Sequence, residues 1–203
     1  MVTESTGKFC ILRDNQNYIF MSINDNQWPP ASAGANIPTA QALAEEKAFQ
    51  EKYPKRNQYY ELAVPLEYLY LLGAKHAGAA YFAILNILDD ATTVGNGHCC
   101  LTEAGAMIGV SALVKARYAY FREQTKGDQT ALYGFSIDYI IGEYKKAIDR
   151  GYDYVRFYNG INAKGQNTVN FGFRKEGSEQ IDGISSRGNG PFLCPPLCPP
   201  GSN

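Results

Sequence analysis

The segment Gly151–Arg174, with the sequence GYDYVRFYNGINAKGQNTVNFGFR, indicates most clearly how this chain folds. Apolar and aromatic residues alternate with polar ones before and after Asn162–Gln166, which contains a glycine. Alternation with a period of two is typical of β-strands, and a short glycine-containing loop between two strands is typical of a hairpin. We therefore expect strands over Tyr152–Ile161 and Asn167–Arg174.

The residues before this hairpin predict an amphipathic helix that begins after Ser136 and ends before Gly151. Serine is a favoured N-cap, and glycine readily adopts the left-handed conformation that ends many helices. Between them, apolar residues recur at the spacing of one helix face: Ile137, Ile140, Ile141, Tyr144 and Ile148.

Other parts of the chain show similar patterns. Pro38–Tyr53, a segment starting at Pro65, and Ser111–Gln124 are expected to be helices. Ala79–Leu88 and His98–Leu101 are expected to be strands, and Lys8–Asp25 a further hairpin.

The two halves of the chain show parallel features at an offset that changes only slightly along the sequence. Val64–Leu69 corresponds in character to Phe135–Ile140, and Gly78 corresponds to Gly151. We therefore predict an α+β protein in which two duplicated helix–helix–β-hairpin units pack together, followed by an extended strap rich in proline and cysteine. The expected segments are an N-terminal hairpin with irregular chain (1–35), a first unit (36–105), a second unit (106–180) and the tail (181–203).

Composition excludes several classes of protein. The 203 residues include 19 basic and 20 acidic side chains, which give a net charge of −1. Duplex nucleic acid and anionic membrane surfaces attract strongly basic proteins, so neither is an expected partner. The sequence shows no secretory signal and no apolar run of about 18 residues, so we expect no membrane insertion. The expected location is the cytoplasm, with signal-independent export as the alternative.

One face of the predicted strand before the loop is a candidate binding surface. Alternation places Tyr152, Tyr154, Arg156 and Tyr158 on the same side of that strand. Aromatic rings beside a guanidinium group are common at the centres of binding surfaces. The alternative is that these side chains cover the outside of the sheet as ordinary packing.

The five cysteines fall into two groups. Cys10, Cys99 and Cys100 lie in apolar stretches, where free cysteine commonly acts as a small buried residue. Cys194 and Cys198 lie in the proline-rich tail, which is expected to be a docking strap. The alternative is a zinc- or thiol-dependent protein in which Cys194 and Cys198 bind the metal, completed by the weaker candidates His98, Cys99 and Cys100.

Enzymatic chemistry has little support in the sequence. No phosphate-binding loop, nucleophile elbow or protease signature occurs, and the chain has only two histidines. A small hydrolase remains as a further alternative. We expect no catalytic residue and no cofactor, with zinc as the alternative.

The hairpin and the tail together resemble a group of uncharacterised small bacterial proteins. In that family a helix precedes a strand of the form (I/V)R(I/F)Yx(G/A)(I/V), then a glycine-containing turn, and the chain ends in CPPxC. The matching segments here are Val155–Ile161, Gly165–Val169 and Cys194–Cys198. The sequence departs from the family at Asn170–Phe173, where an apolar Val-Gly-x-Asp stretch is expected. The resemblance implies the architecture and a bacterial origin, and it implies no activity.

These observations favour a non-enzymatic binding or assembly module. It would act through aromatic-rich sheet surfaces and the C-terminal strap, with another protein or a second copy as its partner. Frequent tyrosine and low charge are typical of such contact surfaces.

Overall fold

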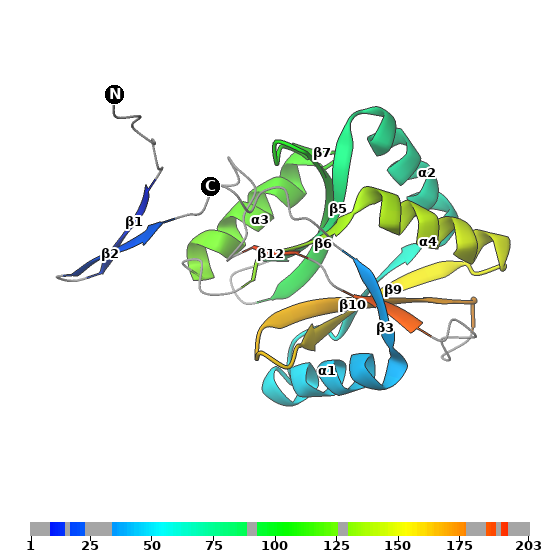
Figure 1. The fold of residues 1–203 in the computed structure, drawn as a ribbon, viewed down its shortest axis with the longest axis horizontal. Coiled ribbons are helices and arrows are strands. Elements are labelled where there is room, and N and C mark those ends of the chain that lie inside the picture. The colour runs from blue at the N-terminus through cyan, green and yellow to red at the C-terminus, as the bar shows by residue number, and fades with distance from the viewer. Residues whose placement is uncertain are drawn as a thin grey trace, which may run out of the picture.

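A computed structural model describes residues 34–88, 93–125 and 130–177 together with four outlying strands. This part of the chain is an α+β protein with four helices and two five-stranded antiparallel sheets (Figure 1). The helices are α1 (Thr39–Lys52), α2 (Val64–His76), α3 (Ala112–Thr125) and α4 (Ile137–Asp149).

The first sheet, here called the β9 sheet, has the order β3-β11-β10-β9-β4. Its strands are β3 (Ala35–Pro38), β4 (Tyr59–Ala63), β9 (Tyr154–Ile161), β10 (Asn167–Arg174) and β11 (Ser186–Asn189). The second sheet, here called the β5 sheet, has the order β12-β8-β5-β6-β7. Its strands are β5 (Ala79–Leu88), β6 (Val94–Thr102), β7 (Met107–Ile108), β8 (Leu132–Ser136) and β12 (Phe192–Cys194). A separate N-terminal hairpin consists of β1 (Phe9–Asp14) and β2 (Asn17–Ser22).

The positions of the buried apolar residues show how the sheets and helices pack in layers. The larger core lies between the sheets, where Phe82 and Phe135 of the β5 sheet meet Phe157 of the β9 sheet. Helices α2 and α4 pack against each other and contribute Leu71 and Tyr144 to this core. A second core lies between the β5 sheet and α3, and α1 packs on part of the other face of the β9 sheet, mainly against β9 (Figure 1).

The same order of elements (helix, strand, helix, hairpin) occurs in residues 39–102 and in residues 112–174. Strands β4 and β8 begin at residues 59 and 132, helices α2 and α4 at 64 and 137, and strands β6 and β10 at 94 and 167. The separation along the sequence is the same for each of these pairs. The first strand of each set pairs with the hairpin of the other set: β4 pairs with β9, and β8 pairs with β5. The two sets therefore share both sheets.

Two asparagines make matching hydrogen bonds to the residues directly before β8 and β4. The backbone N–H of Asn86 donates to the carbonyl of Ala131, and its side-chain amide donates to the carbonyl of Thr130 at 2.7 Å. Asn159 makes the corresponding bonds to the carbonyls of Gln58 and Asn57, the second at 2.8 Å. Both asparagines are buried, and these bonds satisfy their side-chain amides.

Most predicted elements are confirmed with shifts of a few residues. The four helices, the hairpin around residues 162–166 and the N-terminal hairpin are all present. Gly151 follows α4 with a φ of 72°, as expected for a residue that ends a helix. Ser136 occupies the N-cap position of α4, as predicted, but its side chain makes no capping hydrogen bond.

The predicted helix–helix–hairpin unit is also incomplete, because a strand separates the two helices of each set. Strands β4 and β8 have only five residues each and belong to sheets completed by distant parts of the chain. Their pairing is not visible in a local pattern. The tail prediction is only partly within the described residues: Phe192–Cys194 form β12, which pairs with β8, whereas 195–203 lie outside them. Among the described helices, none is long and apolar enough to span a membrane.

Candidate functional site

Strand β4 separates two groups of polar side chains. On its outer side, away from the core between the sheets, lies a group here called the arginine–tyrosine surface: Tyr59, Glu61, Tyr154, Arg156, Tyr158 and Arg174. On its inner side lies a group here called the Glu67–His98 cluster: Tyr60, Glu67, Tyr70, His98, Cys100 and Tyr144. Strand alternation explains the separation, because neighbouring residues of β4 point to opposite faces.

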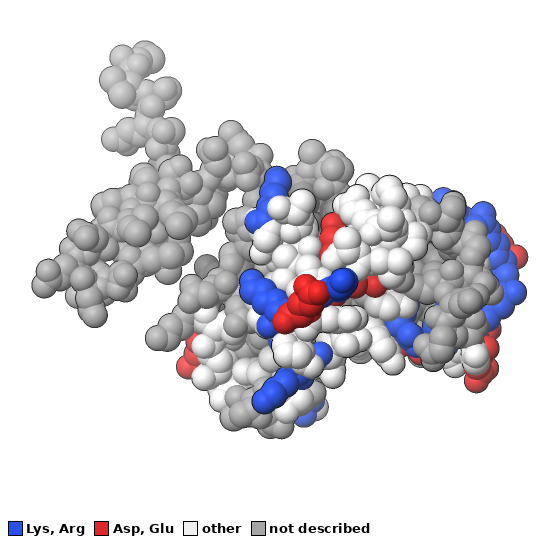
Figure 2. Space-filling model, turned by 90° about the horizontal axis from the view of Figure 1, so that it is seen from below, with Lys and Arg blue, Asp and Glu red and all other residues white. Residues whose placement is uncertain are grey.

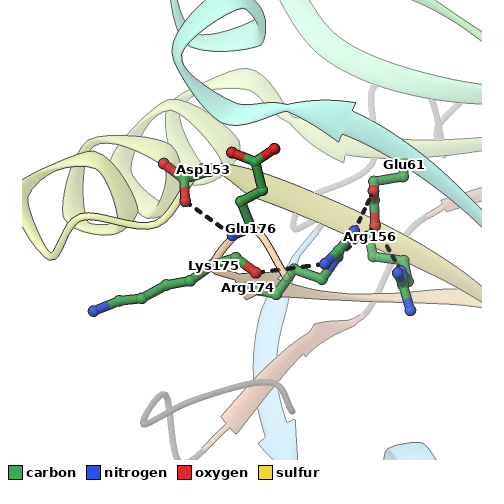
Figure 3. Close-up of polar contacts among 6 residues, drawn as sticks. All are labelled: Glu61, Asp153, Arg156, Arg174, Lys175 and Glu176. Carbon is green, nitrogen blue, oxygen red and sulfur yellow. Dashed lines mark hydrogen bonds and ion pairs between the residues drawn. The ribbon is translucent and has the colours of Figure 1, made fainter. Parts of the chain in front are cut away.

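An ion-pair network forms the centre of the arginine–tyrosine surface (Figure 3). Arg174 donates from Nε and Nη2 to the two carboxylate oxygens of Glu61, each at 2.6 Å. Arg156 donates from Nε to Glu61 Oε2 at 2.7 Å. Hydrogen bonds from Arg174, with further support from Arg156, lower the pKa of Glu61. Two guanidinium groups therefore share one carboxylate, and the three side chains together carry a net charge of +1.

The tyrosines pack around these guanidinium groups. The Arg156 guanidinium lies 4.0 Å from the centre of the Tyr59 ring, and that of Arg174 lies 5.0 Å from the centre of the Tyr154 ring. The rings of Tyr59 and Tyr158 are 6.2 Å apart. Tyr59 is 47% exposed, whereas Arg156 is buried. The most accessible part of the surface is thus an aromatic ring stacked on an arginine that other residues hold in place.

The structure places three of the four predicted binding residues together on this surface. Tyr154, Arg156 and Tyr158 alternate along β9, and Val155 and Phe157 between them lie in the core. Tyr152 precedes β9 and is buried in that core, where its ring lies 6.4 Å from that of Phe173. It is therefore not part of the same face.

Most of the corresponding positions of the β5 sheet are apolar, although Tyr154 has a buried tyrosine, Tyr81, as its counterpart. Arg156 lies between Glu61 and Gly172 across the strands, as Ala83 lies between Gly134 and Cys99. In that sheet Ala83, Leu85 and Leu101 occupy the places of Arg156, Tyr158 and Arg174, and all three are buried in the core beneath α3. The architecture accepts apolar residues at these positions, so the polar and aromatic set is not required by the fold.

The Glu67–His98 cluster is centred on His98 of β6. The hydroxyl of Tyr60 lies 3.0 Å from His98 Nδ1, and Glu67 Oε2 lies 3.6 Å from His98 Nε2. The ring of Tyr70 meets that of His98 edge-on, and the Tyr70 hydroxyl donates to the carbonyl of Gly109 at 2.9 Å. The imidazole is therefore placed between a hydroxyl and a carboxylate.

Burial controls the ionisation of these groups. Glu67 is only 5% exposed, and desolvation raises its pKa to about 7. Desolvation lowers the pKa of His98, and it raises those of Tyr60 and Cys100, each to about 12. Neither Glu67 Oε2 nor the buried Tyr144 hydroxyl makes a hydrogen bond to another described residue. A buried carboxyl that titrates near neutral pH is uncommon outside functional sites.

The predicted metal-binding residues are spread over different places. Cys99 lies in the core beneath α3, whereas Cys100 lies in the core between the sheets with its side chain on the same side as His98. Cys194 belongs to β12, and Cys198 lies outside the described residues. Within the described ranges, no three His, Cys, Asp or Glu side chains are arranged to hold a metal ion.

Sequence reasoning missed Tyr59, Glu61, Glu67 and Arg174. Glu61 is 95 residues from Arg156 and 113 from Arg174, so no local pattern connects them. Glu67 gives a signal in the sequence, because it is a charged residue within the apolar stretch that begins at Leu62.

The charges on the α1 side are mixed. Figure 2, which views the molecule from below Figure 1, shows acidic and basic side chains next to each other among uncharged residues. One such pair on α1 is Lys47 with Glu51, at 3.8 Å. Among its described residues, this face therefore has no large area of a single charge.

The chain matches no protein-family model, and neither the curated proteins nor the solved structures gave a match. The side chains themselves are therefore the basis for inferring a function.

Proposed function

We propose that this chain is a non-enzymatic binding or assembly module, and that its partner contacts the arginine–tyrosine surface. One observation carries the proposal: two arginines and two tyrosines (Arg156, Arg174, Tyr59 and Tyr158) occupy an outer sheet face where the other sheet has buried apolar residues. Tyrosine and arginine are among the residues most enriched at the energetic centres of interfaces.

The surface is suited to binding because much of it is already ordered. Glu61 fixes both guanidinium groups, and Arg156 in turn supports the exposed ring of Tyr59. A partner that covers such a ring loses little side-chain entropy, since the ring is already held. The partner is another protein or a second copy of this chain, and the C-terminal strap contributes to the assembly.

We also propose that the two sets of elements arose by duplication of one unit. The constant separation of matching elements along the sequence and the matched bonds of Asn86 and Asn159 support this. The arginine–tyrosine surface would then be a change in one copy only. Relatives whose halves align at unrelated offsets, with no counterpart of these asparagines, would contradict the duplication.

The Glu67–His98 cluster favours a second candidate, a small hydrolase. A neutral imidazole between a hydroxyl and a carboxylate has the arrangement of a general base with its orienting group. Hydrolysis of a simple activated ester such as p-nitrophenyl acetate would test it. Equal rates for the wild type and His98→Asn would exclude this candidate.

The binding proposal is tested by comparing two exposed tyrosines. Tyr59 lies on the proposed surface, whereas Tyr120, which is 38% exposed, lies on α3 against the other sheet. Light scattering and co-purification should show a complex or self-association for the wild type and Tyr120→Ala, and its loss for Tyr59→Ala. A chain that stays monomeric and recovers no partner would contradict the proposal, as would equal behaviour of the two variants.

A further inference from the structure

Strand β4 has an open edge that matches an occupied edge of the other sheet. Among the described strands β9 is the only partner of β4, so the opposite edge of β4 is unpaired. The corresponding strand of the β5 sheet, β8, has partners on both sides: β5 on one side and the short β12 on the other. The two sheets thus differ at the outer edge of this strand, as they do at their opposite ends, where β10 continues to β11 and β3 but β6 continues to β7.

The pairing register shows which backbone groups are available. Asn159 N–H donates to the carbonyl of Gln58, and Val64 N–H donates to the carbonyl of Asp153. In an antiparallel pair, residues bonded to the neighbouring strand alternate with residues whose N–H and C=O point away. The outward-pointing set of β4 is therefore Tyr59, Glu61 and Ala63.

The same alternation applies to β8, the matching strand of the other set. There Leu132 and Gly134 correspond to Tyr59 and Glu61, and they lie opposite Cys194 and Phe192 of β12. Leu193 lies opposite Tyr133, which corresponds to Tyr60. A segment of three residues with an apolar residue at its centre is thus accepted at this type of edge.

We propose that β4 binds the extended segment 192–194 of a second copy of this chain by antiparallel strand addition, in the register in which that segment pairs with β8. This inference rests on the proposed binding function and specifies how the partner binds. Main-chain hydrogen bonds to the outward groups of Tyr59 and Glu61 provide affinity, as in other strand-addition complexes. The bound segment has an apolar side chain opposite Tyr60, and its flanking residues face the arginine–tyrosine surface.

The position of β4 explains how specificity would arise. Alternate side chains of an added strand point to opposite faces. One set would lie beside Tyr59 and the network of Glu61, and the other beside Tyr60 near His98. The arginine–tyrosine surface and the Glu67–His98 cluster therefore border the same bound segment.

The test measures binding of a labelled synthetic peptide to the full chain. The peptide has the sequence of residues 190–196, with serine in place of cysteine. Fluorescence anisotropy should show saturable binding below about 1 mM. N-methylation of the peptide at the residues equivalent to Phe192 and Cys194 removes the donors that face β4, and should weaken binding at least about tenfold. N-methylation at the Leu193 equivalent is the matched control and should leave binding within about twofold, because that N–H points away.

Two variants and an NMR measurement locate the bound peptide. Glu61→Ala and Glu61→Pro both remove the carboxylate, but only proline removes the outward N–H, so binding should fall further with proline. The peptide should shift the amide signals of Tyr59, Glu61 and Ala63. Absence of saturable binding, equal binding of all methylated peptides, or shifts confined to Leu132 and Gly134 would each overturn strand addition. If Tyr59→Ala abolishes a natural complex while the peptide does not bind, the binding function stands and only this mode fails.

Discussion

Replacing Glu67 by glutamine should make the chain more stable at alkaline pH. Burial raises the pKa of Glu67 from 4.5 to about 7, because the charged carboxylate loses its hydration. Since the pKa is higher in the folded state, the carboxyl stabilises the fold relative to the unfolded chain below 4.5, and this contribution is lost as pH rises towards 7. At about 1.4 kcal/mol per pKa unit, the full loss is about 3 kcal/mol.

The titratable groups that surround Glu67 also affect how the free energy of unfolding changes with pH. His98 is the nearest titratable neighbour, and Tyr60, Tyr70, Cys100 and Tyr144 face the cluster from β4, α2, β6 and α4. The tyrosines and the cysteine stay neutral near pH 7, because their ordinary pKa values lie above 7 and burial raises each of them further. Burial lowers the pKa of His98, so its contribution has the opposite sign: it is present above 6.5 and lost as pH falls.

Urea unfolding of the wild type and Glu67→Gln from about pH 5.5 to about pH 8.5 measures the effect. The advantage of the glutamine variant in the free energy of unfolding should grow by about 2 kcal/mol over that range, because most of the loss occurs there. His98→Asn separates the histidine contribution, and a Glu123→Gln variant on exposed α3 serves as a surface control. Parallel pH profiles for the wild type and Glu67→Gln would refute the reasoning.

Three further outcomes are expected. Glu61→Ala should lower the free energy of unfolding at pH 7 by about 2–4 kcal/mol, because Arg156 and Arg174 lose their shared carboxylate. The difference from the wild type should shrink as pH falls below 4.5, because the pKa of the wild-type carboxyl is lowered in the folded state and the carboxyl is then protonated; urea unfolding across that pH range checks this. Asn86→Ala and Asn159→Ala should each lower the free energy of unfolding by about 0.5–3 kcal/mol, because each removes the hydrogen bond from a buried side-chain amide to a backbone carbonyl. A difference of more than a few kcal/mol between the two variants in thermal unfolding would show that the two positions are not equivalent. Cys99 and Cys100 should react with a thiol reagent only after unfolding, because both are buried and burial raises both pKa values. The measurement uses a variant in which serine replaces Cys10, Cys194 and Cys198, and fast reaction of the folded protein would contradict the packing.

Local patterns in the sequence were sufficient for part of the fold. Helix α4 and the β9–β10 hairpin were predictable because each has a complete period and a recognisable end, such as Gly151. Strands β4 and β8 were not predictable in this way. Each has five residues, and each is stabilised by a hairpin from the other half of the chain.

The candidate site was predictable to a similar degree. Strand alternation placed Arg156 beside Tyr154 and Tyr158, and the structure keeps these three on one face. Their chemical environment depends on Glu61 and Tyr59, which come from β4 in the first half of the chain. The ionisation of Glu67 also depends on tertiary burial, which a single sequence does not specify.

The central claim is that a partner contacts the arginine–tyrosine surface, and site-specific photo-crosslinking tests it most directly. A photoreactive phenylalanine derivative would replace Tyr59 in one chain and Tyr120 in another, because both tyrosines are exposed and they lie on different elements. On irradiation in the cells that express the chain, the account predicts a discrete crosslinked product from position 59 and none from position 120. Products of equal yield from both positions, or from position 120 alone, would contradict it.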